Sequence, residues 1–521
     1  MGKVKVWHSL PRDLHAVQPR LSPKFSASLA SGEKSKTWRQ VDYYTGAPWQ
    51  LLLDDSILFL QNFFYLKNIV LPLWNASGRA FPSGYLDELY PSLGNIHDIV
   101  FHSILIVTQS AFILSLPFLA ALPSPVLFGY IGIFVAVNQL ACWRLNGYMP
   151  RGVLNSTNFP ECKDWKIHQR EQWVFLNGVA VGKHWLQGNI DRISRTFHRP
   201  VLGVHNKTSG IIFDVIQCLL ERCLYFGTTD TRGCFAIISD LLRDNEKKVI
   251  LILHSQGGLE GSIILDWLMN QHSQEAMRRL EIYTFGNAAN HFNDPRTLQD
   301  EESAPSCFDK RAVGHIEHYA NSNDFVARWG VIHFKKKTAA QSEREFAANA
   351  GAAVYSKGTD HAHFIQPYTE IRQNDSVEQK WNSYHGDLFE RDGSGHQLNQ
   401  HYLDNMFPLD KAMKGVEVTE DGGPLACTFM DTEVDVINDP REMDKIRGKR
   451  RGYKNQWLED GLNGVVSKHK VYQLSRLWSY TNGRRPEDCP QADMPIEKMS
   501  FEGRSKLYLG QDKNGKTGVV I

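Results

Sequence analysis

The segment Val249-Ile-Leu-Ile-Leu-His-Ser-Gln-Gly-Gly258 decides the fold of this chain. Residues 249–253 are all apolar, and this run has the length and composition of a strand buried inside a parallel sheet. Beyond Ser255 and two glycines, apolar residues recur at helical spacing between positions 259 and 268. The segment therefore predicts a strand, a tight turn that carries a serine, and a helix packed on the sheet.

The turn resembles the nucleophile elbow of α/β hydrolases, whose pattern is G-x-S-x-G. Gly257 stands two residues after Ser255, where a strained turn brings backbone against backbone. Leu253 occupies the first glycine position, so this chain departs from the pattern there. We expect smaller neighbours around Leu253 or a looser turn. The alternative interpretation is that Ser255 only caps the following helix.

A second segment, residues 173–185, contains a strand, the pair Asn177-Gly178, a loop and the start of a helix that ends near Phe197. It resembles the His-Gly segment that follows the third strand of α/β hydrolases. The resemblance implies that the backbone N–H groups of Val179 and Gln256 form an oxyanion hole, assisted by the helix dipole. The alternative is a plain strand-loop-helix connection.

Two further segments, residues 280–290 and 315–328, look like the strands that follow the elbow in α/β hydrolases. They are similar to the Thr-Phe-Gly and Asn-Asp-x-Val-x-Arg segments of fungal triacylglycerol-lipase-type enzymes. In that family the aspartate is the triad acid, which implies this role for Asp324. A carboxylate at the carboxyl edge of a parallel sheet is well placed to orient an imidazole. The alternative is an aspartate that caps a turn.

The general base has to be chosen among 20 histidines. His396 lies in a glycine-bearing loop that leads into a helical stretch, as α/β hydrolases often present this residue. His401 is the rival, five residues further on. His361 and His363 lie in a polar stretch without a matching context.

Ser255, Asp324 and His396 follow one another in the chain order of α/β-hydrolase triads. The resemblance covers roughly residues 173–406. It implies an α/β fold with a mostly parallel sheet flanked by helices (the α/β-hydrolase fold) and a serine hydrolase that needs no cofactor. The eight cysteines show no C-x-x-C spacing, which indicates neither a zinc site nor a disulfide framework and favours a reducing compartment.

An apolar helical hairpin is predicted before this domain, because residues 99–143 contain no Asp, Glu, Lys or Arg. The stretch divides at Leu122-Pro-Ser-Pro125 into halves, residues 99–122 and 126–143, of about membrane-spanning length. Polar residues within both halves leave two alternatives, namely a pair of buried helices in a soluble domain or a re-entrant hairpin that does not cross. Arg144, Arg151 and the basic N-terminus favour the cytosolic side for both flanks.

The predicted organisation has four parts. Residues 1–40 form a flexible basic N-terminus, 41–150 an apolar helical membrane-associated region, 165–410 the α/β-hydrolase domain and 411–521 a polar C-terminal extension. Residues 49–74 are expected to lie in the membrane interface or to pack against the hairpin. The insert at 335–391 is a lid or a surface elaboration. The extension holds a predicted helix at 471–480 and a basic cluster at 445–451, which is a solvated run, a lipid-headgroup site or a nucleic-acid site.

These observations predict a membrane-associated serine hydrolase, esterase- or lipase-like, that cleaves a hydrophobic ester or an acyl lipid. The hairpin is expected to pass the membrane twice and leave the hydrolase domain in the cytosol. A net charge of +1 provides no general attraction for nucleic acid, so none is expected as a partner, and the oligomeric state stays open. Three alternatives remain. In the first, the same triad carries out acyl transfer or tailors a natural product. In the second, the fold is a catalytically silent membrane scaffold. In the third, the hairpin is the functional part and the globular domain is regulatory.

Overall fold

The computed structural model describes most of the chain between residue 47 and residue 519. The described residues are 47–73, 80–119, 122–157, 159, 168–295, 311–335, 337, 384–425, 427, 429–437, 466–486, 509–511 and 517–519. The basic N-terminus, His361, His363, most of the predicted insert and the basic cluster at 445–451 lie outside these residues.

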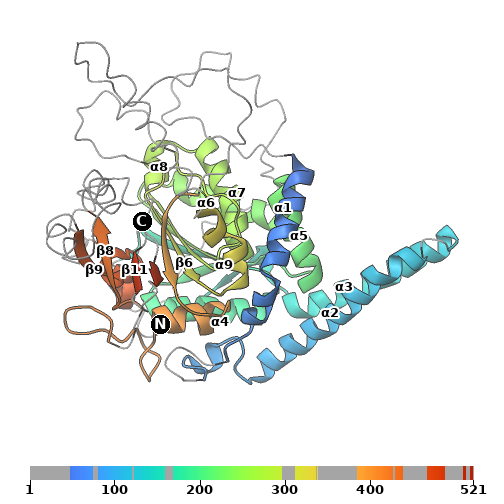
Figure 1. The fold of residues 1–521 in the computed structure, drawn as a ribbon, viewed down its shortest axis with the longest axis horizontal. Helices are drawn as coiled ribbons and strands as arrows, with labels where there is room; N and C mark the ends of the chain where they lie inside the picture. The colour runs from blue at the N-terminus through green and yellow to red at the C-terminus, as the bar shows by residue number, and fades with distance from the viewer. Residues whose placement is uncertain are drawn as a thin grey trace, which may run out of the picture.

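The centre of the molecule is a mostly parallel sheet in the order β1-β3-β2-β4-β5-β6-β7 (Figure 1). Its strands are β1 (Val153–Asn155), β2 (Glu171–Leu176), β3 (Val201–Val204), β4 (Lys248–His254), β5 (Leu280–Phe285), β6 (His315–Asn321) and β7 (Asp387–Arg391). Only β1 runs antiparallel to its neighbour among these seven strands. The predicted strand before the serine is confirmed as β4, which lies between β2 and β5.

Helices cover both faces of the sheet, because successive side chains of a buried strand point to opposite sides. On one face, Leu251 and Leu253 pack with α6 (Thr229–Arg243) and α7 (Gln256–Gln271). On the other face, Ile250 and Ile252 pack with α4 (Lys183–Phe197) and with segments from the C-terminal part. The α/β class and the helix predicted to end near Phe197 are therefore confirmed.

The C-terminal segments contribute to this second core. Beyond residue 410, Met430, Val471, Trp478 and Tyr480 are all buried in it. The helix predicted at 471–480 is wrong: the chain forms α14 (Val471–Leu474) and a separate 3-10 turn, η9 (Trp478–Gly483). Buried Glu317 explains the break, since its carboxylate accepts main-chain N–H groups at positions 476 and 477 that would otherwise continue the helix.

The two remaining sheets pair β8 (Glu433–Ile437) with β9 (Val466–Lys470) and β10 (Leu509–Gln511) with β11 (Thr517–Val519). The last residues of the predicted insert at 335–391 form β7, which is the edge strand of the main sheet. The described cysteines are free thiols in buried positions.

The segment that was predicted to lie either in the membrane interface or against the hairpin packs on the globular domain. It forms α1 (Pro48–Gln61) and η3 (Phe63–Ile69), which contact α5 (Ile211–Leu224) and α9 (Phe325–Trp329). Asp55 of α1 accepts two hydrogen bonds from Arg222 of α5, at 2.7 and 2.9 Å, and both side chains are buried. The outer side of the segment remains apolar and exposed.

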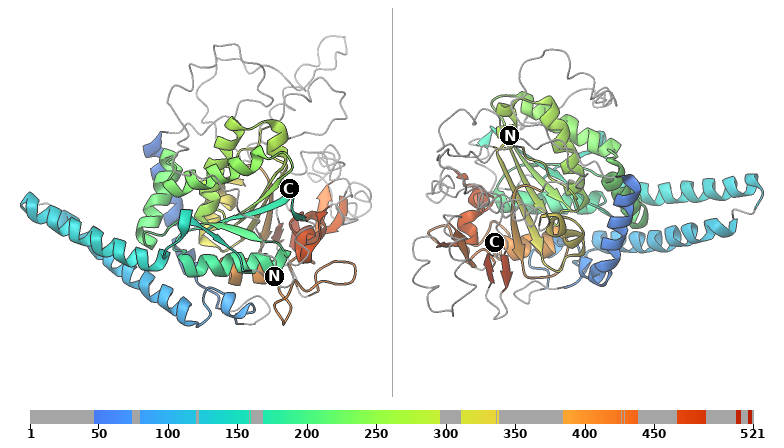
Figure 2. Two further views of the ribbon diagram at one scale, coloured as in Figure 1. Left: turned by 180° about the vertical axis from the view of Figure 1, so that it is seen from behind. Right: turned by 45° about the horizontal axis from the view of Figure 1, so that its top comes forward.

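The predicted hairpin is formed by α2 (Leu93–Leu119) and α3 (Ser124–Asn146), which project together from the body of the molecule (Figures 1 and 2). Both helices are long and apolar enough to cross a membrane. They extend further towards the domain than the charge-free stretch, and α2 includes buried Asn95 and Asp98. Shorter helices, η4 (Gly84–Leu86), η5 (Pro150–Gly152) and α8 (Gln274–Arg278), connect the larger elements.

Leu253, the departure from the elbow pattern, is accommodated by a glycine elsewhere in the turn region. A Cβ atom added to Gly261, in the second turn of α7, would lie 2.3 Å from Leu253 Cδ1. Leu253 itself is fully buried. The space that the usual first glycine provides is thus supplied by the helix that packs over the leucine.

The close contact between Gly261 and Leu253 predicts that one substitution at Gly261 has opposite effects on stability in two backgrounds. Gly261→Ala should lower the free energy of unfolding by about 1–3 kcal/mol, because the new methyl group overpacks against Leu253. In a Leu253→Ala background, the same change should raise it by about 1 kcal/mol through helix propensity. Urea unfolding of the four proteins measures both effects, and an equal effect in the two backgrounds would contradict the contact.

Candidate functional site

Ser255 is held in a strained turn between β4 and α7. Its backbone has φ 59° and ψ −123°, a conformation that costs a residue with a side chain roughly 1–3 kcal/mol. Gly257 permits the turn, since a Cβ atom there would lie 2.4 Å from the carbonyl oxygen of Leu176. The local pattern of the sequence therefore produces an elbow, and Ser255 makes no side-chain cap bond to α7.

Three distant pieces of chain meet at this turn. The Ser255 hydroxyl lies 2.8 Å from Nε2 of His396, and Nδ1 of the same ring lies 2.8 Å from Oδ2 of Asp324. The structure thus brings together the serine, histidine and aspartate that the sequence selected. The arrangement allows the carboxylate to hold one ring nitrogen while the other faces the hydroxyl.

Asp324 caps a helix with one carboxylate oxygen and faces His396 with the other. It begins α9 as the N-cap, with Oδ1 accepting a hydrogen bond from the N–H of Val326 at 2.8 Å. Its other oxygen, Oδ2, accepts from the Tyr402 hydroxyl at 2.6 Å as well as facing His396. The side chain is fully buried, so these donors replace water around its charge.

The loop that carries His396 is fixed from several sides. Asn321 donates to the carbonyl of Gly395 at 2.8 Å, and the Glu88 carboxylate accepts the N–H of Asn399 at 2.9 Å. The His254 ring stacks on the His396 ring with centroids 4.8 Å apart, and its Nε2 bonds the His396 carbonyl. Burial, together with the neighbouring His396, holds the pKa of His254 well below its usual value.

The rival histidine has a structural role. Nδ1 of His401 accepts the main-chain N–H of Gln397 at 2.9 Å, so the ring proton is on Nε2, which donates to the carbonyl of Pro72 at 2.7 Å. Burial lowers the pKa of His401 to about 4. Both ring nitrogens are therefore engaged away from Ser255.

The two predicted oxyanion donors belong to segments that meet at the serine, since a Cβ atom on Gly178, next to Val179, would lie 2.4 Å from Ser255 Cβ. Gln256 is the first residue of α7, and Val179 lies in the loop after β2. Within the described residues, neither main-chain N–H donates a hydrogen bond to another protein group. Next to Val179, Ala180 adopts a positive φ of 63° and donates its N–H to Asp214 at 3.1 Å, which fixes the shape of the loop.

A buried polar chain links these two segments, and sequence reasoning missed it. Asn177 Oδ1 accepts the N–H of Asn206 at 2.9 Å, and Asn206 donates to the Gln256 side chain at 3.0 Å. Gln256 donates in turn to Glu221 of α5 at 3.1 Å, and burial raises the pKa of Glu221 to about 7. The only available sequence signal was the position of Asn206 just after β3, at the same sheet edge as the site.

The site is closed in this structure. Ser255 is 4% exposed, His396 is 6% exposed and Asp324 is not exposed at all. Residues 68–72 contribute to the closure: Asn68 donates to the carbonyl of Asn323, and Gln397 donates to that of Ile69. The three side chains therefore have almost no contact with solvent in this conformation.

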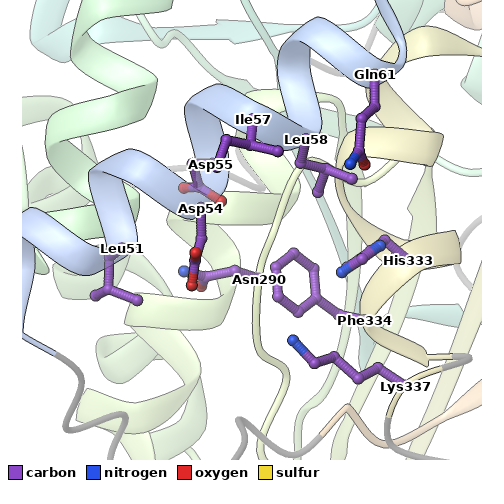
Figure 3. Close-up of a pocket in the computed structure, with 10 residues that line it drawn as sticks. All are labelled: Leu51, Asp54, Asp55, Ile57, Leu58, Gln61, Asn290, His333, Phe334 and Lys337. Carbon is purple, nitrogen blue, oxygen red and sulfur yellow. The ribbon is translucent and has the colours of Figure 1, made fainter.

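A separate pocket of about 240 Å³ lies between α1 and the chain after α9 (Figure 3). Its lining is both polar and apolar, and the residues are Leu51, Asp54, Asp55, Ile57, Leu58, Gln61, Asn290, His333, Phe334 and Lys337. None of the three site residues lines it. In the part of the chain that the structure describes, no group of His, Cys, Asp or Glu is arranged to hold a metal ion.

No protein-family model, curated protein or solved structure matches this chain in comparison. The chemistry of the site has to be inferred from its geometry and from the sequence segments.

The Tyr402–Asp324 contact predicts a difference between two fully buried tyrosines. Tyr402→Phe removes the donor to Asp324 and leaves the N–H of Asn321 without its acceptor, so the free energy of unfolding should fall by about 1.5–3 kcal/mol. Tyr384→Phe is the matched control, because its hydroxyl is buried with no partner among the described residues. Chemical denaturation should show little change or a gain for the control; equal losses would contradict the assigned contact.

Proposed function

We propose that this protein is a membrane-associated serine hydrolase of the α/β-hydrolase class that cleaves esters of hydrophobic acyl groups. The observation that carries the proposal is the hydrogen-bonded series Ser255–His396–Asp324, with both contacts at 2.8 Å. A strained serine beside an imidazole that is itself held by a carboxylate is the arrangement that activates a hydroxyl.

The proposed reaction uses only groups of this chain and water. Ser255 Oγ attacks the ester carbonyl carbon while His396 Nε2 takes the hydroxyl proton. The N–H groups of Val179 and Gln256 stabilise the negative charge on the carbonyl oxygen. The C–O bond then breaks, His396 gives the proton to the leaving alcohol, and an acyl group remains on Ser255. A water molecule repeats the steps, releases the acid and restores the serine.

The position of the site supports the α/β-hydrolase class. Ser255 follows β4 near the middle of the sheet, Asp324 follows β6, and His396 follows β7 at the same carboxyl edge. This agrees with the similarity of the segments around Phe285 and Asp324 to those of fungal triacylglycerol-lipase-type enzymes. Ligands of open parallel sheets generally bind at this edge.

Leu253, which departs from the elbow pattern, is the sequence feature that would favour an inert scaffold. Gly261 makes room for that side chain, and the backbone of Ser255 retains the elbow conformation. The departure from the pattern therefore gives no reason to expect a displaced hydroxyl.

The hairpin supports a location at a membrane. Two apolar helices return the chain to the side from which it came, so the catalytic domain and both flanks share one face. Arg144 lies in the last turn of α3 and Arg151 follows the helix closely, which favours the cytosolic face.

A fluorophosphonate probe tests the proposal directly, because it reacts with activated serines. The wild-type protein should be labelled, and both Ser255→Ala and His396→Ala should reduce the labelling rate roughly 10³-fold or more, since the triad acts as a unit. The measurement is gel fluorescence against time, with circular dichroism to show that each variant is folded.

His401→Gln is the control, because its amide can still donate to the carbonyl of Pro72. It should keep most of the labelling rate. An unlabelled wild-type protein that is folded would contradict the enzyme proposal and favour a scaffold. Product analysis with an added alcohol separates hydrolysis, which yields the acid, from acyl transfer, which yields a new ester.

A further inference from the structure

The depth to which the α2–α3 hairpin enters a membrane is limited by contacts at its base. Gln109, in the middle of the apolar stretch of α2, is fully buried. Its amide donates to Asn138 of α3 at 2.8 Å and to the carbonyl of Ser209 at 2.7 Å, and Asn138 donates to the same carbonyl at 3.3 Å. Two of the polar residues that interrupt these apolar helices, Gln109 and Asn138, therefore bind the hairpin to the globular domain.

The clamped loop belongs to the catalytic domain. Ser209 lies between β3 and α5, and its N–H donates to Asp214, the residue that also holds Ala180 beside the oxyanion loop. If both helices crossed a bilayer, Gln109 would lie near the middle of the hydrocarbon. This loop would have to enter with it, together with Lys207, whose side chain is 52% exposed and lies 3.6 Å from Asp230, and charged side chains are costly inside the hydrocarbon.

The free part of the hairpin is too short to cross. On α3, Phe134 contacts Phe213 of α5 edge to face, with ring centroids 6.0 Å apart. Beyond Gln109 and Phe134 the arms are residues 110–119 and 124–133, each about 15 Å long at about 1.5 Å per residue. The hydrocarbon core of a bilayer is about 30 Å thick, so the arms reach its middle.

The end of the hairpin suits an apolar surrounding. No Asp, Glu, Lys or Arg occurs between residues 99 and 143, although the tip of a crossing hairpin would emerge in water. Pro123 and Pro125 lack the N–H groups that a turn in hydrocarbon would leave without acceptors.

A second apolar surface lies beside the place where the hairpin leaves the domain. We call it the α1–α5 face. It consists of exposed side chains of α1, η3, α5 and the residues just after α5, including Trp49, Leu53, Leu60, Phe64, Leu220 and Phe226. The elements α1 and α5 contact each other, α5 contacts α2, and all of them lie on the side from which the hairpin projects (Figures 1 and 2).

We infer that the protein is monotopic: the hairpin ends within one leaflet, and the α1–α5 face rests on the surface of that leaflet. This inference rests on the membrane association in the proposed function and replaces the two crossings predicted from the sequence. Exposed apolar side chains on several neighbouring elements next to an apolar hairpin fit a lipid surface, which covers both at once. The catalytic domain then takes its substrate from the leaflet that it contacts.

The position of the hairpin tip relative to the bilayer tests whether the hairpin ends within one leaflet. Full-length Ser124→Cys is bound to the outside of sealed phosphatidylcholine–phosphatidylserine vesicles and treated with a charged maleimide, added outside or trapped inside. We expect loss of labelling from both sides and full labelling in detergent. Leu425→Cys, whose native leucine is 65% exposed, is the control and should label from outside; the parent chain gives the background of native thiols.

Each other result overturns the inference. Labelling of Ser124→Cys from inside means two crossings, and labelling from outside means that the tip is not inserted. The readout needs no catalysis and can be repeated with Ser255→Ala. A reactive Ser255 with an accessible tip thus refutes the topology alone, whereas a protected tip with an unreactive Ser255 refutes the hydrolase alone.

The α1–α5 face is tested with nitroxide labels in the same vesicles. At Leu60→Cys and Leu220→Cys, the ratio of collisions with a water-soluble nickel complex to collisions with oxygen should be several-fold lower than at Leu425→Cys. Equal ratios at all three positions would show that the face does not rest on lipid.

Discussion

The register of β4 between β2 and β5 is the constraint on which the rest of the site depends. It places the end of an apolar strand at the carboxyl edge of the sheet, where the chain must turn sharply to start α7. Ser255 occupies the strained position of that turn, and the strain is maintained by two buried elements on either side of it. Because β6 and β7 end at the same edge, the loops after them bring Asp324 and His396 to the same hydroxyl.

The sequence alone predicted the parts of the site that local patterns determine. A buried strand followed by Ser-Gln-Gly selected Ser255, a glycine-bearing loop before a helical stretch selected His396, and the resemblance of residues 315–328 to fungal triacylglycerol-lipase-type segments selected Asp324. Contacts between distant segments were not predictable in this way. Tyr402 reaches Asp324 only through the π-helical turn at Leu398–Leu403, and Gly261 meets Leu253 only when α7 packs back over β4.

The contacts between the hairpin and the globular domain were likewise not predictable from the sequence. Its apolar composition and the proline-marked turn were recognisable, but Gln109 and Asn138 gave no indication of the partner that they would bind. In the structure they donate to the carbonyl of Ser209, which connects the hairpin to the loop that holds Ala180 beside Val179. The apolar hairpin and the sheet edge that carries Ser255 are therefore parts of one packed arrangement rather than two independent modules.

In the proposed reaction, the hydroxyl of Ser255 forms a covalent acyl intermediate. Rapid acid quenching after mixing with an activated fatty-acyl ester, followed by peptide mapping with mass spectrometry, tests it most directly. We predict that the acyl mass is found on the peptide containing Ser255 and that it disappears as product forms. Ester turnover without acylation of that peptide, or acylation confined to another residue, would contradict the account.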